Sequence, residues 1–203
     1  MKHKPIIYLL RHGEIELGGE LRFVGQVDLP LTGLGIRQAE WWREKLASKD
    51  FGQVYCSDLS RCRHTAELVM EGRDISIQPT PQFREIKLGE WDGQTIADIL
   101  NNHSDEWAKR QKDIAGYCPP GGESFYDLQN RVVPVFEEIL ESSDKDVLIV
   151  AHAGVNRVIM CHVVDIPLKN LFRIGQDYCC LNIIDHEFHG IRIRALNIRP
   201  DVE

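Results

Sequence analysis

The sequence predicts an α/β fold, a three-layer sandwich in which a mostly parallel central sheet lies between helices. Three observations lead to this class. Short apolar runs alternate with longer segments of helical periodicity. Residues 146–150 are mostly apolar, as in a strand covered on both faces. Residues 191–197 alternate apolar with charged side chains, which suits an edge strand.

The first half of the chain predicts three strands and two helices. The strands are expected at 6–10, 54–56 and 75–78, and the helices at 32–48 and 59–70. Thr32 can cap the first helix, because its hydroxyl can accept a hydrogen bond from a free backbone N–H group. The apolar residues of that helix lie near one face: Ile36, Ala39, Trp42 and Leu46.

The second half begins with a helix at 95–111 and a loop at 115–122, which contains two prolines and two glycines. Ser124, with Asp127 three residues later, predicts the start of a long helix. Its buried stripe is expected at Phe125, Leu128, Val132, Val135 and Ile139. A strand at 146–150, a helix at 155–164, and strands at 180–185 and 191–197 with a turn at 186–190 complete the chain.

Composition excludes several classes of protein. The 203 residues are 43% hydrophobic and 27% charged, as in ordinary globular proteins. No apolar run approaches the roughly 18 residues that a membrane span needs, so no membrane partner is expected. The net charge of −7 argues against nucleic acid as a partner, but a few clustered arginines can still form a positive pocket. The six cysteines include no Cys-x-x-Cys pair and predict reduced thiols in a cytoplasmic protein.

Residues that follow the strands are the candidates for chemistry, because ligands bind beyond the carboxyl ends of parallel strands. Arg11 and Arg61 offer planar forks that match phosphate oxygens. His12 and His152 supply nitrogens that can attack, donate or accept. Gly154 opens a helix whose N-terminus favours an anion. Together these residue types predict phosphoryl transfer.

An acid near this group can donate a proton to a leaving oxygen. Glu85 follows a strand and a proline break, and it is the candidate. Glu90 and Asp92 are nearby carboxylates, so a merely solvated acidic loop is the alternative. No metal site is indicated by the sequence.

The segment Arg11-His12-Gly13 resembles the signature of the histidine phosphatase superfamily, which includes the phosphoglycerate mutases. Four later segments resemble the same family in the same order: 25–32 with Gly35, 57–62 with Thr65, Glu85 with Gly89, Trp91 and Gly93, and 150–155. The resemblance implies a phosphoglycerate mutase-like fold. It also implies a single domain over 1–203, with a helical and loop insertion at about 86–122 that covers the active site.

The resemblance implies a role for each candidate. His12 is the nucleophile and forms a phosphohistidine, and Glu85 protonates the leaving oxygen and later helps to activate water. Arg11, Arg61 and His152 hold the phosphoryl oxygens. Gly13 and Ala153 are expected to contact the phosphate as well. Where the family often has Thr and Asn, this chain has Ile15 and Gly18, and Gln26 is expected to supply the missing amide contact. No cofactor and no metal are implied.

Within the superfamily the chain most resembles the α-ribazole phosphatases of cobalamin synthesis. The features are its compact length, residues 121–125 and the tail at 172–185, some of which broad-specificity phosphatases share. We therefore expect a phosphomonoester hydrolase acting on a small phosphate ester. A cofactor-dependent phosphoglycerate mutase and a non-catalytic phospho-ligand-binding relative are the alternatives. A homodimer is left open.

Several residues have structural alternatives. His12 and His152 can be hydrogen-bonded core histidines. Arg63 and His64 are expected on a solvated helix face, and His186 and His189 in an exposed turn. One of Trp41 and Trp42 is expected in the core. Three residues are candidates for the leaving-group pocket: Glu123, Ser124 and Tyr126.

Overall fold

The computed structural model describes residues 4–187 and 190–202. Its centre is a six-stranded sheet in the order β3-β2-β4-β1-β5-β6. The strands are β1 (Ile7–Arg11), β2 (Phe51–Cys56), β3 (Ile77–Pro79), β4 (Asp146–Ala151), β5 (Leu181–Glu187) and β6 (Gly190–Ile198). The first four are parallel to one another, and β5 is antiparallel to β1 and β6. The predicted mostly parallel sheet is confirmed, and 191–197 lie in an edge strand as expected.

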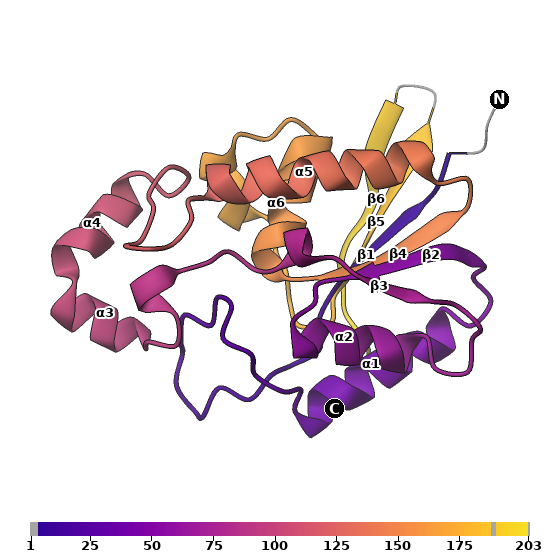
Figure 1. The fold of residues 1–203 in the computed structure, drawn as a ribbon, viewed down its shortest axis with the longest axis horizontal. Helices are drawn as coiled ribbons and strands as arrows, with labels where there is room; N and C mark the ends of the chain where they lie inside the picture. Colours follow the sequence, from indigo (N-terminus) through magenta and orange to yellow (C-terminus); the bar gives the residue numbers. More distant parts are fainter. Residues whose placement is uncertain (1–3, 188–189, 203) are drawn as a thin grey trace.

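Helices cover both faces of the sheet, so the three layers are confirmed (Figure 1). The α-helices are α1 (Gly33–Lys45), α2 (Ser60–Val69), α3 (Ile96–Asn102), α4 (Ser104–Lys112), α5 (Phe125–Ser142) and α6 (Ala153–Val163). Short 3-10 helices lie at η1 (Pro81–Phe83), η2 (Gly89–Trp91) and η3 (Leu168–Arg173). The pair α1 and α2 packs on one face, and the pair α5 and α6 on the other.

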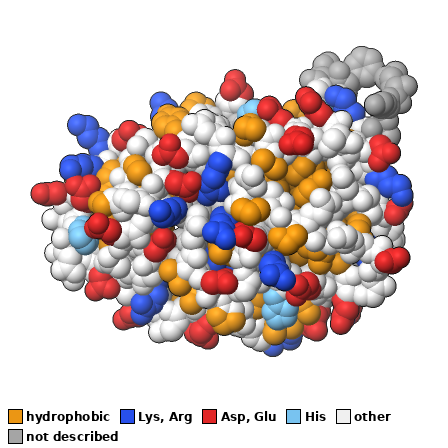
Figure 2. Space-filling view, in the orientation of Figure 1, with side chains coloured by type: hydrophobic (Ala, Val, Ile, Leu, Met, Phe, Trp, Pro, Cys, Tyr) orange, Lys and Arg blue, Asp and Glu red, His pale blue; other side chains and the backbone are white. Residues whose placement is uncertain are grey.

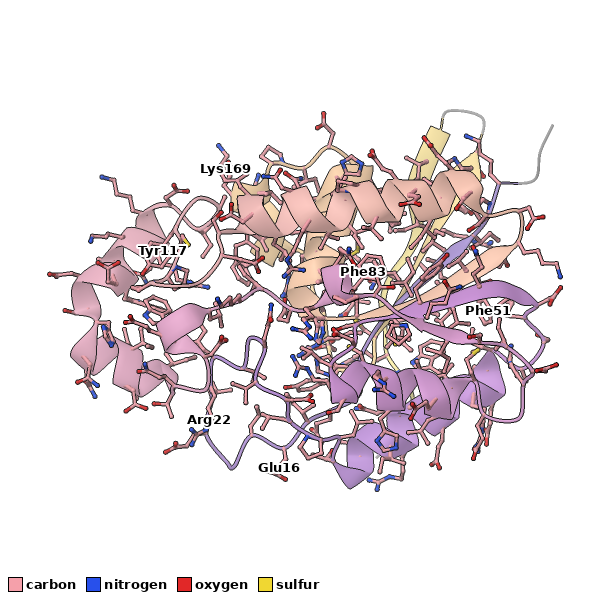
Figure 3. All side chains as sticks on the ribbon, in the orientation of Figure 1. Glu16, Arg22, Phe51, Phe83, Tyr117 and Lys169 are labelled. Carbon is pink, nitrogen blue, oxygen red and sulfur yellow. The ribbon has the colours of Figure 1, made fainter. Side chains whose placement is uncertain are left out.

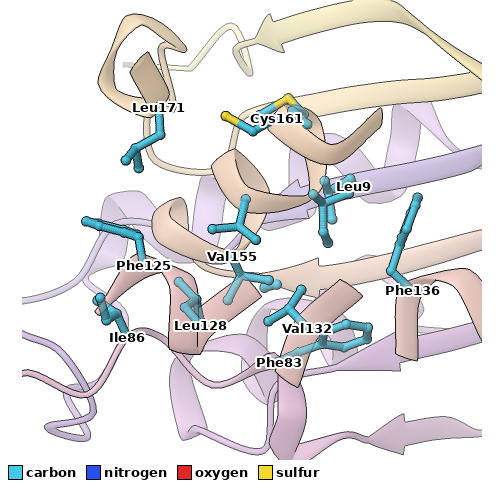
Figure 4. Close-up of a cluster of buried hydrophobic side chains, with 14 of the residues drawn as sticks. Leu9, Phe83, Ile86, Phe125, Leu128, Val132, Phe136, Val155, Cys161 and Leu171 are labelled. Atoms are coloured by element: carbon cyan, nitrogen blue, oxygen red, sulfur yellow. The ribbon is translucent and has the colours of Figure 1, made fainter. Parts of the chain in front are cut away.

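The alternation of side chains along β1 explains the two cores. Ile7 and Leu9 are fully buried in the core beneath α5 and α6, where Figure 4 labels Leu9, whereas Leu10 is fully buried in the core beneath α1 and α2. Because successive strand residues point to opposite faces, a strand covered on both sides is apolar throughout. Burial of each such side chain stabilises the fold by about 1.5–3 kcal/mol.

Both predicted caps are present. The Thr32 hydroxyl accepts a hydrogen bond from the amide of Gly35 (3.0 Å) at the start of α1. At the start of α5, the Ser124 hydroxyl accepts from the Asp127 amide (3.1 Å), and the Asp127 carboxylate accepts from the Ser124 amide (2.9 Å). These reciprocal bonds satisfy N–H groups that the helix itself cannot.

Three predictions of local structure were wrong. The single helix at 95–111 is two helices that break at His103, whose φ is −137°, and the acidic first turn of α4 favours a new start there. Phe136, rather than Val135, completes the buried stripe of α5. His186 lies half-buried in β5 and not in an exposed turn, because the strand runs to Glu187. His189 lies outside the described residues.

Helices α3 and α4 lie beyond one end of the sheet, at the left of Figure 1. A buried aromatic cluster supports this segment. The ring of Trp91 is fully buried, 5.5 Å from Phe23 and 5.5 Å from Tyr117. Figure 3 shows Tyr117 in the segment that joins α4 to α5, and Arg22 in the loop after β1. The cluster therefore packs the loop after β1 against the segment around α4.

The surface carries both signs of charge, with acidic and basic side chains interspersed over the face in Figure 2. Arg63 and His64 are exposed as predicted, and Trp42 is buried while Trp41 is half-buried against it. All six cysteines are free thiols. Within the described ranges, the helices are all too short or too polar to cross a membrane.

Candidate active site

The ends of two neighbouring parallel strands bring His12 and His152 together. Arg11 at the end of β1 is in register with Ala151 at the end of β4. The amide of His12 then donates a hydrogen bond to the carbonyl of Ala151 (3.0 Å). As a result the two imidazole ring centres lie 5.1 Å apart although 140 positions separate the residues. Parallel pairing explains this meeting, because it places both carboxyl ends at one edge.

The His12 ring is held in one orientation by a backbone contact. Its Nδ1 atom lies 2.8 Å from the carbonyl oxygen of Gly13. A carbonyl oxygen only accepts, so Nδ1 carries the hydrogen and Nε2 keeps a lone pair. The ring is 4% exposed and lines a cavity that Arg11, Arg61 and Glu85 also line. This tautomer is the one that a nucleophilic Nε2 requires.

Two arginines flank this ring. Arg61 is buried and donates to the carbonyls of Val27 (2.7 Å) and Gly25 (2.8 Å), while its Nε faces His152 Nδ1 at 3.3 Å. A guanidinium has five N–H bonds, so Arg61 has two left for a ligand. Arg11 donates to the carbonyl of Gln176 (2.7 Å). Both arginines line the cavity.

The surroundings keep both histidines neutral. Burial is the largest cause that lowers the pKa of His12 well below its usual value, and the charges of Arg11 and Arg61 lower it further. Burial also lowers the pKa of His152, followed by the charge of Arg61. A cation near an imidazole disfavours its protonated form. His12 is therefore uncharged at neutral pH, as an attacking nitrogen must be.

Glu85 is the candidate acid that reaches the cavity. Its Oε1 accepts a hydrogen bond from the Ile86 amide (2.9 Å), and its Oε2 accepts from the Gly154 amide (3.0 Å) at the N-terminus of α6. The alternatives lie elsewhere. Glu90 is exposed, and the Asp92 carboxylate faces the backbone amide of Leu88. Burial raises the pKa of Asp92, whose contacts hold the loop.

Two residues that were predicted to contact the phosphate, Gly13 and Gln26, instead donate hydrogen bonds to other protein atoms. The Gly13 amide donates to the Thr65 hydroxyl (3.1 Å). The Gln26 side-chain amide donates to the Glu85 carbonyl (3.0 Å). Gln26 therefore positions the acid segment, and neither residue lines the cavity.

Ala153 and His152 differ in their access to this cavity. Ala153 lines it from the first turn of α6. His152 is fully buried and does not reach the cavity surface. Its Nε2 lies 2.9 Å from the Ser57 hydroxyl, and its Nδ1 accepts from Arg61. In this arrangement His152 contacts Arg61 directly.

The cavity, of about 320 Å³, extends from His12 to the segment around α4. Much of its wall is apolar or aromatic, including Leu17, Phe23, Ile86, Ile114, Tyr117, Phe125, Phe172 and Tyr178. Of the residues expected in a leaving-group pocket, Glu123 lines it, Ser124 instead caps α5, and Tyr126 is exposed elsewhere.

The sequence analysis missed three arginines and a tyrosine of this wall: Arg22, Arg110, Arg157 and Tyr178. Arg157 could have been found, because it lies one helical turn after Gly154. Tyr178 stacks against Arg11, whose guanidinium carbon lies 3.9 Å from the ring centre. Arg110 had no signal in the sequence, since only the packing of α4 brings it here. Across the described residues, no three His, Cys, Asp or Glu side chains are grouped to hold a metal ion.

Comparison with known proteins finds phosphatases, in agreement with the phosphoryl-transfer chemistry that these residues predict. The family model for the histidine phosphatase superfamily (branch 1) matches residues 7–199. The chain is 32% identical to adenosylcobalamin/alpha-ribazole phosphatase of Salmonella typhimurium, with 95% of this chain and 96% of the relative covered. It is 31% identical to a probable phosphoglycerate mutase of Serratia proteamaculans, with 89% and 85% covered. The crystal structure of a putative alpha-ribazole-5'-P phosphatase from Escherichia coli matches with a TM-score of 0.90 at 28% identity, covering 99% of this chain and 100% of the other.

Proposed function

We propose that this chain, which belongs to the histidine phosphatase superfamily, hydrolyses phosphate monoesters through a covalent phosphohistidine on His12. One observation carries the proposal. The Gly13 carbonyl holds Nδ1–H of His12, which leaves the Nε2 lone pair available beside the cations Arg11 and Arg61. A buried neutral imidazole between two guanidinium groups has the properties of a nucleophile toward a phosphate dianion.

In the first step, Nε2 of His12 attacks phosphorus and the ester P–O bond breaks. The leaving oxygen takes a proton from the Glu85 carboxyl group. The transition state spreads negative charge over the equatorial oxygens, and fixed cations at Arg11 and Arg61 stabilise it. In this proposal His152 orients Arg61, because its Nδ1 accepts from the Arg61 Nε (3.3 Å). The direct phosphoryl contact that the family resemblance implies would require its Nε2 to leave the Ser57 hydroxyl, which now lies 2.9 Å away.

In the second step, a water molecule attacks phosphorus while the Glu85 carboxylate removes its proton. The N–P bond breaks, its electron pair returns to Nε2, and inorganic phosphate leaves. Division of the reaction into two displacements replaces one difficult step with two easier ones. Residues 86–122 form the proposed cover of the site, because Ile86, Leu88, Arg110, Ile114, Tyr117 and Pro119 line the cavity.

The proposed substrate is α-ribazole phosphate, with broader phosphomonoesterase activity as the wider class. Relatives named as alpha-ribazole phosphatases support this choice, and so does the aromatic wall of the cavity, which suits a flat apolar alcohol. The relatives named as probable phosphoglycerate mutases favour the alternative activity, isomerisation of phosphoglycerate.

A cytoplasmic location is part of the proposal, supported by the free thiols. The molar mass in solution, measured by light scattering, distinguishes a monomer from a homodimer.

A rapid-quench experiment tests the mechanism. The enzyme is mixed with 32P-labelled substrate, from a panel that holds α-ribazole phosphate, sugar phosphates, nucleotides and phosphoglycerates. An acid-labile, base-stable adduct that maps to His12 is expected. Turnover without this adduct would refute the phosphohistidine route. Isomerisation of 3-phosphoglycerate, with 2,3-bisphosphoglycerate present, at a rate above phosphate release would favour the mutase. Binding without any turnover would favour the non-catalytic alternative.

A further inference from the structure

The segment between η3 and β5 holds the guanidinium group of Arg11. The backbone carbonyl of Gln176 accepts a hydrogen bond from this guanidinium (2.7 Å), and the ring of Tyr178 stacks on it, with its centre 3.9 Å from the guanidinium carbon. A carbonyl oxygen carries no net charge, so this contact orients the guanidinium without neutralising it. The remaining N–H bonds of the side chain stay available to a phosphoryl oxygen.

The same segment is joined to the backbone at the end of β1. The Cys179 amide donates to the His12 carbonyl (2.9 Å), and the Arg11 amide donates to the Cys180 carbonyl (3.0 Å). The φ of Cys179 is +52°, in a region that residues other than glycine rarely adopt. Its carbonyl accepts from the indole N–H of Trp42 (2.7 Å). Such a conformation persists only where surrounding contacts hold it, so the segment depends on its neighbours for its shape.

A buried network of three amide side chains holds Gln176 itself. Asn182 of β5 pairs with Gln176 in both directions: its Nδ2 donates to Oε1 of Gln176 (3.1 Å), and its Oδ1 accepts from Nε2 of Gln176 (2.9 Å). Asn156 of α6 donates through its Nδ2 to the same Oε1 (2.9 Å). Gln176 is 6% exposed, and the two asparagines are fully buried.

The amide network is anchored to three strands of the sheet. Asn182, in β5, donates to the carbonyl of Leu9 in β1 (3.1 Å) and accepts from the amide of Asn197 in β6 (2.9 Å). The side chain of Asn197 in turn accepts from the amide of Asp177 (2.8 Å), which is the next residue after Gln176. The position of the Gln176 side chain is therefore fixed by elements that are far apart in the sequence.

The chemistry of the amide network suggests a purpose beyond filling the core. Buried amides are costly unless they are hydrogen-bonded, and apolar side chains fill a core without that risk. A connected polar network makes the groups that it holds rigid. Gln176 is the link to the proposed phosphoryl site, because its side chain belongs to the network and its own carbonyl accepts from Arg11.

We propose that Gln176 is a positioning residue for Arg11, and that Asn156 and Asn182 hold it in place. The inference rests on the proposed function, in which Arg11 stabilises the charge of the transferred phosphoryl group. A cation that is fixed before the reaction stabilises that charge better than a mobile one. Gln176 is not among the residues that line the cavity, so its effect on the phosphoryl group depends on Arg11.

A double-mutant cycle tests this dependence. Gln176→Met keeps most of the side-chain volume and removes the amide, and it is made both in the natural chain and in Arg11→Met. Orthovanadate is the probe, because it resembles phosphate in shape and charge and binds without turnover. Its dissociation constant is measured by calorimetry, and kcat/KM for 4-nitrophenyl phosphate is measured in the same proteins. We expect Gln176→Met to weaken orthovanadate binding about tenfold in the natural chain and less than about twofold in Arg11→Met, as for coupled residues.

Asn156→Leu tests the same link with less disturbance of the fold. Within the described part of the chain, Oδ1 of Asn156 has no hydrogen-bond partner. Leucine therefore removes one hydrogen bond together with an unsatisfied oxygen. We expect the same pattern as for Gln176→Met, with a loss of about threefold in the natural chain. If Gln176→Met does not fold, the cycle with Asn156→Leu decides.

Gln53→Met is the matched control for the change from glutamine to methionine. Gln53 is half-buried in β2, and its Oε1 accepts from the Ser143 hydroxyl. It pairs with Val147 near the start of β4, at the end of the sheet opposite to the proposed phosphoryl site. This variant should bind orthovanadate as the natural chain does.

The outcomes separate this inference from the proposed function. Equal losses in the natural chain and in Arg11→Met would overturn the positioning role, because the damage would then be general. Unchanged binding and kcat/KM in both network variants would also overturn it, and in either case phosphohistidine formation on His12 stands. Absence of both orthovanadate binding and adduct formation in the natural chain would overturn the proposed function and this inference together. A loss confined to proteins that keep Arg11, with Gln53→Met unchanged, supports the positioning role.

Discussion

The Oε2 atom of Glu85 accepts a hydrogen bond from the amide of Gly154 at 3.0 Å, which joins the acid segment to the first turn of α6. The glycine is required for space. A Cβ atom at position 154 would overlap Oε1 of Glu85. The side chain of the proposed acid and the N-terminus of the helix are therefore fitted to one another.

Gly154→Ala should reduce activity without loss of stability. The added methyl group displaces the Glu85 carboxylate, while alanine favours the helix over glycine by about 1 kcal/mol. We expect kcat to fall about 10–100-fold, the range of a weakened general acid. The phosphorylation step should suffer more with an alkyl phosphate than with 4-nitrophenyl phosphate, whose leaving group needs no proton. Rapid-quench rates and thermal unfolding provide the two measurements.

Gly33→Ala is the matched control for this substitution. Gly33 also lies in the first turn of a helix, and a Cβ there would meet its nearest atom, on Arg37, at 3.7 Å. It should leave activity unchanged. Equal effects of both substitutions on activity would contradict the fit between Glu85 and Gly154.

His12→Ala should abolish turnover, because the nucleophile is lost. We expect kcat to fall by a factor of about 10⁴ or more, with circular dichroism unchanged. His64→Ala, on the exposed face of α2, should retain full activity. Dialysis against EDTA should leave the natural chain active. Recovery of lost activity on addition of a divalent metal would instead indicate a metallophosphatase.

Arg11→Met should shift the pH profile toward higher pH. The Arg11 charge lowers the pKa of His12, so its removal raises that pKa. Only neutral His12 attacks, and the acid limb of kcat/KM should therefore move upward. Because substrate ionisation near pH 6 masks a lower pKa in this limb, an NMR titration of the His12 imidazole in both enzymes provides the deciding measurement. An unchanged or lower His12 pKa in Arg11→Met would show that this charge does not act on His12.

Stability should fall as pH decreases below about 6.5. Burial lowers the pKa of His12 and His152 in the folded chain, so the unfolded chain binds more protons below its own histidine pKa of about 6.5. Each histidine then costs up to about 1.4 kcal/mol per pH unit until its folded pKa is reached. Above that window neither contributes a slope.

Urea unfolding at pH 7.5 and pH 5.5 measures this effect. His152→Asn removes one of the two groups and should reduce the difference in unfolding free energy. The paired carboxylates of Asp58 and Asp185, whose pKa values are lowered by arginines, lose their contribution only below about pH 4. Equal stability at the two pH values would contradict neutral burial of both imidazoles.

Much of the fold could be predicted because periodicity and caps are local properties. The apolar run that includes Leu148 specified a strand covered on both faces, and Ser124 specified the start of α5. The break at His103 was not predicted. Asp105 and Glu106 favour a new helix start there, but Leu100 and Trp107, seven residues apart, also fit one continuous helix. The burial of Phe136 over Val135 depends on how α5 rotates against the sheet, which is a property of the packed structure.

The sequence by itself determined the chemical inventory: His12, Arg11, Arg61, Glu85 and His152 follow strands or breaks, and parallel strands end at one edge. Only the tertiary structure decided which atoms of these residues are available. It directed the amides of Gly13 and Gln26 into the protein, buried His152 behind Arg61, and placed Arg110 beside Phe172. The physical reason is that a residue type and its position along a strand are local, whereas access to a cavity depends on distant segments that compete for the same hydrogen bonds and the same space.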